Sequence, residues 1–172
     1  MKHCTRCVLP DTHESINFDE EGVCNVCRQA QTKHTNLDWQ ASGTMLDDLC
    51  NKYRGTGNYD CIVPFSGGKD SAFQLWYIVT QLHMKPLVVR FNHWGYRPLV
   101  HKNNTKIFKK LGVDILEFTP NWHIVKKLML ASLKKTGDFC WHCHTGVFAH
   151  TMQIAVRYQI PLVFWGESPA EY

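Results

Sequence analysis

The stretch that most constrains the fold is Ser-Gly-Gly-Lys-Asp-Ser at residues 66–71, because it connects two apolar segments of different character. Residues 61–65 are rich in β-forming types and predict a buried strand, and residues 72–82 are apolar on nearly every side and predict a covered helix. Two adjacent glycines let the backbone turn sharply and leave N–H groups open to a ligand. The positive end of the helix dipole points at the same place, so the loop predicts an oxyanion site, with phosphate as the favoured ligand.

The side chains of this loop suit the triphosphate of a nucleotide. Ser66 and Ser71 supply hydroxyls, Lys69 supplies a cation, and Asp70 supplies a carboxylate that could hold Mg²⁺ or cap the helix. A Walker A loop needs four residues between its glycines, and that motif does not occur in the sequence. The stretch instead resembles the PP-loop of ATP pyrophosphatases, which split ATP into AMP and pyrophosphate. A strand-to-helix turn whose glycines serve geometry alone is the alternative.

Composition bounds the class of protein. A chain of 172 residues with 44% hydrophobic residues fits one domain, or a domain with a small appendage. Its first residues are not those of a signal peptide, and no apolar run reaches the roughly 18 residues of a membrane span, so we expect a cytoplasmic protein without a membrane partner. A formal charge of +4 is a weak bias that does not favour nucleic acid as a partner.

Eight cysteines in a chain without a secretion signal favour metal or redox chemistry over disulfides. Two Cys-x-x-Cys pairs, Cys4/Cys7 and Cys24/Cys27, are separated by sixteen residues and together complete a tetrahedral shell for Zn²⁺. Residues 1–32 are too few to build a core alone, so we expect a zinc ribbon or knuckle whose metal supplies folding energy. A redox pair or an iron–sulfur cluster is the alternative, and no catalysis is predicted there.

A third pair, Cys140/Cys143, precedes a predicted helix. Two thiolates do not complete a metal shell, so His142, His144 or residues outside this chain would have to contribute. Three interpretations stay open: a second metal site, a sulfur-carrying redox pair, or two packed core cysteines. A place at a helix N-terminus predicts a lowered thiol pKa. The two remaining cysteines are predicted to be small buried hydrophobes: Cys50 and Cys61.

After a helical linker at residues 33–57, strands and helices alternate through residues 58–172, which we assign to a PP-loop ATP-binding domain that is incomplete at its C-terminus. Further strands are predicted at 87–91, 113–118 and 162–165. This rhythm indicates right-handed crossovers and an α/β fold with a mostly parallel, doubly wound sheet. Ligands of such sheets lie beyond the carboxyl ends of the strands, at the point where the strand order reverses.

Three loops are therefore expected to converge: 66–71, 91–95 and 166–168. The second loop is predicted to hold adenine or ribose through backbone groups near Phe91 and the side chain of Asn92. Glu167, in the third, is predicted to reach Mg²⁺ or the incoming nucleophile. For Asn92 and His93, a purely local role as strand-end caps stays open.

The motifs, taken in order, resemble the N-acetyl sugar amidotransferases, PP-loop enzymes of bacterial lipopolysaccharide and nonulosonic-acid pathways. The resemblance implies ATP-dependent conversion of the acetamido group of a nucleotide sugar to an acetamidino group, with ammonia delivered by a glutaminase subunit. Members of that family are longer, so we expect this chain to be the amino-terminal portion. The resemblance spans the whole chain and rests on these stretches: Cys-Thr-Arg-Cys-Val-Leu-Pro-Asp-Thr at 4–12, Phe-Asp-Glu-Glu-Gly-Val-Cys-Asn-Val-Cys at 18–27, the PP-loop, Gly-Asp-Phe-Cys-Trp-His-Cys-His at 137–144 and Trp-Gly-Glu-Ser-Pro-Ala-Glu-Tyr at 165–172.

The resemblance also implies roles for the loop residues. Lys69 would offset the charge of the pyrophosphate, Asp70 would hold Mg²⁺, and the pyrophosphate portion would be held by Ser66, Gly67, Gly68 and Ser71. Two other functions remain as alternatives. One is a tRNA thiolase of the same superfamily, which shares the PP-loop, the zinc ribbon and a comparable Cys-x-x-Cys. The other is a zinc-ribbon adaptor whose PP-loop is vestigial.

Overall fold

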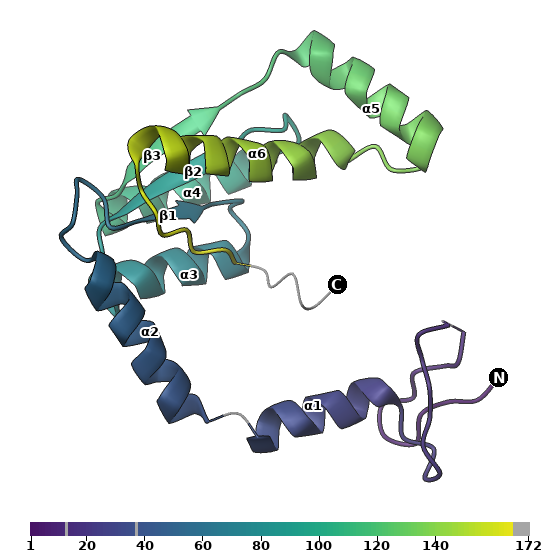
Figure 1. Ribbon diagram of the computed structural model, residues 1–172. Coiled ribbons are helices and arrows are strands. Elements are labelled where there is room, and N and C mark those ends of the chain that lie inside the picture. Colours follow the sequence, from purple (N-terminus) through teal and green to yellow (C-terminus); the bar gives the residue numbers. More distant parts are fainter. Residues whose placement is uncertain (13, 37, 167–172) are drawn as a thin grey trace. The chain divides into compact units, whose positions relative to one another are not determined.

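The computed structural model of this protein describes residues 1–12, 14–36 and 38–166, and it describes the side chains in those ranges except at 34–36. The chain divides into two compact units, Met1–Asp48 and Leu49–Tyr172 (Figure 1).

The first unit is built around the two amino-terminal cysteine pairs. Its only regular pairings among the described residues are the antiparallel bridges His3↔Pro10 and Phe18↔Cys24. Helix α1 (Asn25–Asn36) follows at once, and α2 (Trp39–Tyr53) begins before the unit ends. The buried side chains are few, namely Cys4, Val23 and Cys24. So small a core agrees with the expectation that a metal contributes much of the folding energy.

The second unit holds a parallel sheet of three strands in the order β1-β2-β3. Their bounds are Cys61–Pro64 for β1, Pro86–Phe91 for β2 and Asp114–Phe118 for β3. The predicted α/β class with a parallel sheet is confirmed. The predicted fourth strand is reduced to one parallel bridge, Ile62↔Val163. Two hydrogen bonds form this bridge: the Ile62 N–H donates to the Leu162 carbonyl (2.8 Å), and the Phe164 N–H donates to the Ile62 carbonyl (2.9 Å).

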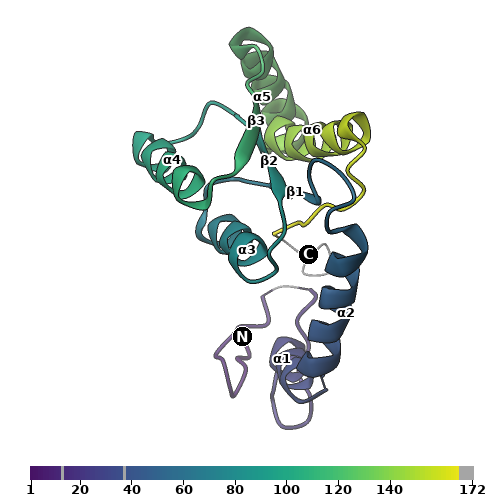
Figure 2. The same cartoon turned by 90° about the vertical axis from the view of Figure 1, so that its left-hand side faces the viewer.

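Helices cover both faces of this sheet. Figure 2 shows α3 (Lys69–Thr80) and α4 (Pro98–Leu111) on one side and α6 (Trp141–Tyr158) on the other. Helix α5 (Trp122–Thr136) packs against α6. The chain thus goes from β1 to β2 and β3 in one direction and then returns to the far edge of β1 at Val163. The loop after β1 therefore lies where the strand order reverses, as predicted.

The core explains why the strands take this order. All six residues of β2 are buried, as expected of a central strand, whereas the edge strand β3 is mostly exposed. Ile62, Leu87 and Val89 pack against Ile154 and Ala155 of α6. Cys50 and Cys61 are fully buried, so their predicted place in the core is confirmed.

Candidate nucleotide site and cysteine metal centre

The loop between β1 and α3 is open to solvent on its ligand-facing side. Ser66, Gly68, Lys69 and Asp70 are exposed, and Gly67 is half-buried. Gly68 stands before the first helical residue and no side chain of the described chain caps the helix there. Because the first N–H groups of an α-helix have no acceptor within the helix, this end is available to an anion. The loop could therefore hold a phosphate group.

Serine hydroxyls hold the loop in shape. The Gly67 N–H donates to Ser71 Oγ (3.2 Å), and the Gly68 N–H makes a longer bond to Ser66 Oγ (3.4 Å). Ser71 Oγ lies 3.2 Å from both Ser66 Oγ and the Gly68 carbonyl oxygen, to which it donates. Ser71 is buried and Ser66 is exposed, so the inner hydroxyl organises the turn while the outer one faces solvent.

Gly67 has no space for a side chain. Its φ is +86°, and a Cβ built there would lie 2.6 and 2.8 Å from the two terminal atoms of the Asn104 amide and 2.9 Å from Val100 Cγ1. Asn104 is almost fully buried in α4. Only glycine therefore permits both this backbone conformation and the close approach of α4 to the loop.

A buried cation lies behind the loop. With its amide oxygen toward Arg90, Asn104 accepts from Arg90 Nη2 (3.2 Å) and donates to the Val100 carbonyl (3.1 Å). Arg90 Nη1 pairs with Glu117 Oε2 at 2.6 Å, and the arginine side chain is only 6% exposed. Arg90 also lies over the rings of Tyr96 and Phe108. This cluster links β2, β3 and α4 beside the loop.

A cavity of about 280 Å³ opens beside the loop and brings together parts of the three predicted loops. Its volume is near the lower end of the roughly 300–1,000 Å³ typical of small-molecule sites. One wall belongs to the loop and another to α6, and the predicted site residues that line it are these: Ser66, Gly68, Asp70, Ser71, Phe91 and Cys143. Gly166 also lines it, whereas Glu167 and Ser168 lie outside the described residues.

Asn92 has local partners on both sides of its amide. Its Oδ1 accepts from the Trp94 N–H (3.0 Å), and its Nδ2 lies 3.4 Å from Glu117 Oε1. These bonds match the strand-end cap that the sequence left open, and a direct contact of Asn92 with the nucleotide stays a prediction. Three further predicted residues do not line the cavity, although residues near them in sequence do: Gly67, Lys69 and Cys140.

The thiol pKa of Cys143 differs from the prediction made from sequence. Cys140 is the N-cap of α6, so the predicted place of the pair at a helix N-terminus is right. The expected lowering of the thiol pKa is wrong for Cys143, because burial raises its pKa, with a further contribution from Cys140. Burial disfavours the charged thiolate and so raises the pKa.

Several cavity residues were not singled out from sequence. Tyr96, Phe148 and Trp165 line it, and the rings of Phe148 and Trp165 stack with centroids 4.5 Å apart. The sequence does contain a signal for the role of Arg90, because a charged residue inside a buried apolar strand needs a nearby partner. Asn104 carried none, since its approach to Gly67 depends on how α4 packs.

The first two cysteine pairs converge. The sulfur atoms of Cys4, Cys7, Cys24 and Cys27 all lie within 4.8 Å of one another, and no other such group of three or more metal-binding side chains occurs in the described ranges. Backbone N–H groups of Cys24 (3.2 Å) and Arg6 (3.4 Å) donate to Cys4 Sγ. Although burial opposes it, these bonds and one from Cys7 lower the pKa of Cys4 to about 6. Four convergent sulfurs with amide donors fit a tetrahedral metal ion such as Zn²⁺.

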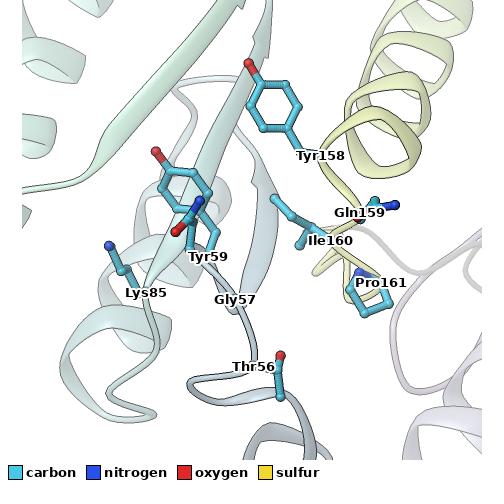
Figure 3. Close-up of a pocket in the computed structure, with 9 residues that line it drawn as sticks. Thr56, Gly57, Tyr59, Lys85, Tyr158, Gln159, Ile160 and Pro161 are labelled. Atoms are coloured by element: carbon cyan, nitrogen blue, oxygen red, sulfur yellow. The ribbon is translucent and has the colours of Figure 1, made fainter.

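A second cavity, of about 410 Å³, lies at the opposite ends of the strands (Figure 3). It is lined by the turn before β1, by Lys85 before β2, and by the end of α6. The Tyr59 hydroxyl, beside it, donates to Asp114 Oδ2 (2.8 Å). None of the predicted site residues lines this cavity, and the amino ends of parallel strands are not where such sheets bind ligands.

Comparison with known proteins does not assign the chain to a family. No family model matches it. An uncharacterised protein of Methanocaldococcus jannaschii is 26% identical over 114 residues, which is 66% of this chain and 41% of that protein. An NMN synthetase from Francisella tularensis is similar in structure, with a TM-score of 0.48 and 13% identity over 69% of this chain and 49% of that one. A tRNA thiolase from Methanococcus maripaludis, solved with its 4Fe–4S cluster, has a TM-score of 0.44 and 15% identity over 96% of this chain and 53% of that one.

The chain therefore spans about half, or less, of the length of each of these proteins. Across the described residues, none of the helices combines the length and the apolar character needed to cross a membrane.

Proposed function

We propose that this chain is the nucleotide-binding part of an ATP-dependent amidotransferase, which adenylates the acetamido group of a nucleotide sugar and exchanges the adenylate for ammonia. The observation that carries the proposal is the open Ser66–Ser71 loop at the switch point of a parallel sheet, with a cavity beside it. The ordered motifs that resemble the N-acetyl sugar amidotransferases support the choice of substrate. Ammonia would come from a glutaminase subunit in the cytoplasm.

The proposed chemistry has two balanced steps. In the first, the amide oxygen attacks the α-phosphorus of ATP and pyrophosphate leaves. In the second, ammonia adds to the amide carbon, a proton is lost, and AMP leaves with the oxygen. The protein contributes mainly position and charge neutralisation.

Each part of the loop has a task in this scheme. The N–H groups of Gly67 and Gly68 would exchange their serine partners for phosphate oxygens. Lys69 would offset the pyrophosphate charge, and the exposed Asp70 carboxylate suits Mg²⁺, which when bound would neutralise phosphate charge. The Cys4/Cys7/Cys24/Cys27 centre would hold structural Zn²⁺, because all four positions of a tetrahedral shell are filled by protein.

Replacing Asp70 tests the assignment. We expect Asp70→Asn to abolish AMP formation from ATP and the acceptor sugar while leaving the thermal unfolding of the protein unchanged, because the carboxylate is exposed. The matched control is Asp47→Asn, which removes an exposed carboxylate on α2. AMP release by Asp70→Asn at the wild-type rate would refute the assignment.

One observation favours a second candidate, the tRNA thiolase. Cys143 lines the same cavity as Ser66 and Asp70, where a sulfur-bearing group could meet an adenylated substrate. A protein purified without oxygen that shows iron–sulfur absorbance in the visible range and binds tRNA would favour it. Metal analysis discriminates as well, because one zinc per chain fits the four-cysteine centre alone. Absence of ATP binding in the presence of Mg²⁺ would instead favour the zinc-ribbon adaptor.

A further inference from the structure

The loop that follows β2 is held in an unusual conformation that presents one side chain to the cavity. Trp94 has a φ of +67°, which is uncommon for a residue with a side chain. The conformation is maintained by two hydrogen bonds, from the Trp94 N–H to Asn92 Oδ1 (3.0 Å) and from the indole Nε1–H to the Pro120 carbonyl (2.8 Å). Backbone strain of this kind persists where the surroundings over-determine it, and it clusters at functional sites.

The side chain presented by this loop is His93, which lines the cavity together with Ser66 and Asp70. Its ring lies 4.4 Å from that of Tyr96, centroid to centroid. A Cβ at Gly95 would come within 2.8 Å of both Nδ1 and Cε1 of His93, so the backbone at Gly95 presses against that edge of the ring. The ring is therefore held from two sides.

The hydrogen bonding of the ring decides what it can do. The Gly95 N–H donates to His93 Nδ1 at 3.1 Å. A neutral imidazole whose Nδ1 accepts a hydrogen bond carries its proton on Nε2. Nε2 is thus a donor and has no lone pair with which to accept a proton.

We infer that His93 is a neutral hydrogen-bond donor, through Nε2–H, to a phosphate oxygen of the nucleotide, and that it is not a general base. The inference rests on the proposed function, because it takes the ligand of the loop to be a nucleotide. A donor in the cavity that the Ser66–Ser71 loop also lines would bind an oxygen that carries negative charge, and charge-assisted hydrogen bonds are the strong ones.

The surroundings of this imidazole shift its pKa downward. Burial lowers the pKa of His93, a hydrogen bond with its own backbone opposes that shift, and the nearby side chains of His142 and Arg90 lower the pKa further. The titratable and charged groups that share its surroundings come from β2, from the loop itself, from α6 and from α3: Arg90, Tyr96, His142, Cys143, His144 and Asp70.

Binding measurements on matched variants test the inference. We expect His93→Phe to weaken binding of MgATP by about 10- to 100-fold, because it removes a hydrogen bond to a charged group. His93→Gln keeps an N–H donor and should stay within about threefold of the wild type. His123→Phe, which removes an exposed histidine from α5, should bind like the wild type. Thermal unfolding shows whether each variant is folded.

Binding of AMP and of pyrophosphate, measured separately, locates the contact. A loss confined to AMP assigns His93 to the α-phosphate, and a loss confined to pyrophosphate assigns it to the outer phosphates. Equal binding of all three ligands by His93→Phe and the wild type would overturn the inference alone. If the wild type bound no MgATP, this inference and the proposed function would fail together.

A measurement on the unaltered protein guards against a variant that does not fold. Nitrogen-15 NMR of the imidazole at about pH 7 should show His93 protonated at Nε2 and unprotonated at Nδ1. A ring protonated at Nδ1, or at both nitrogens, would overturn the inference whatever the variants do.

Discussion

Replacing Gly67 by alanine tests the geometry on which the proposed nucleotide site depends. The new Cβ would meet the Asn104 amide at 2.6 and 2.8 Å and Val100 at 2.9 Å, in a backbone conformation with φ at +86°. Neither neighbour can move freely, because Asn104 is buried and hydrogen-bonded to Arg90 and to the Val100 carbonyl. The loop, rather than α4, is therefore expected to shift.

The magnitude follows from two costs. A residue with a Cβ loses about 1–2 kcal/mol in the left-handed conformation, and overpacking a filled site costs about 1–3 kcal/mol. We expect Gly67→Ala to lower the free energy of unfolding by about 2–5 kcal/mol, which is a large share of the roughly 5–15 kcal/mol that holds a typical domain. Affinity for MgATP should fall as well, because the displaced loop carries the N–H groups that we propose to bind phosphate.

The neighbouring glycine supplies the control. Gly68 has a φ of −77°, and a Cβ there would find only Ser66 Oγ, at 3.6 Å. Gly68→Ala should therefore cost less than about 1 kcal/mol, the scale of an N-cap effect. Urea unfolding followed by tryptophan fluorescence compares the two variants. Equal stability of Gly67→Ala and Gly68→Ala would refute the argument that α4 closes on the loop at Gly67.

Four further outcomes are expected. Chelation of the metal, or the substitution Cys24→Ser, should remove one zinc per chain, as measured by metal analysis. Circular dichroism should then show loss of structure in the amino-terminal segment, while the unfolding transition of the parallel-sheet unit stays unchanged. Gly146→Ala should destabilise by about 1–3 kcal/mol, since its Cβ would overlap the ring of Phe91, and Phe91→Leu in the same chain should recover part of the loss in a double-mutant cycle. Asp60→Asn should cost about 1–3 kcal/mol in chemical denaturation, because the two oxygens of the buried carboxylate accept from the N–H groups of Gly55 and Lys85, both at 2.7 Å. In asparagine an NH2 group replaces one of these oxygens and leaves one of the two N–H groups without an acceptor. Burial lowers the pKa of His150 below 6.5, so the unfolded chain binds more protons in acid; stability should fall as pH drops below about 6.5, and His150→Leu should flatten that dependence.

Much of the fold could be predicted from sequence, because the decisive signals were local. The apolar run at 61–65, the paired glycines after it and the apolar helix beyond them are each visible within a few residues. The alternation of strands and helices then limits the topology through the handedness of parallel crossovers. The cysteine spacing is local too, which is why the four-sulfur centre could be expected before its atoms were seen together.

The candidate site was predicted only in part. The place of the site beyond β1 follows from topology, whereas the composition of its walls does not. The sequence does not reveal that Arg90, Asn104 and Gly67 are neighbours in space, because Asn104 lies 14 positions after Arg90 and 37 positions after Gly67. The raised pKa of Cys143 was missed for the same reason, because it depends on burial by other elements.

The amino-acid sequence alone determined where the chain turns tightly, which segments alternate, and which cysteines are spaced for a metal, because these properties depend on near neighbours. Only the tertiary structure decided that α4 closes on the Ser66–Ser71 loop at Gly67, that α6 brings Cys143 to the cavity beside it, and that His93 Nδ1 accepts from the Gly95 N–H. The first two of these contacts join residues far apart in the chain, and packing alone selects them.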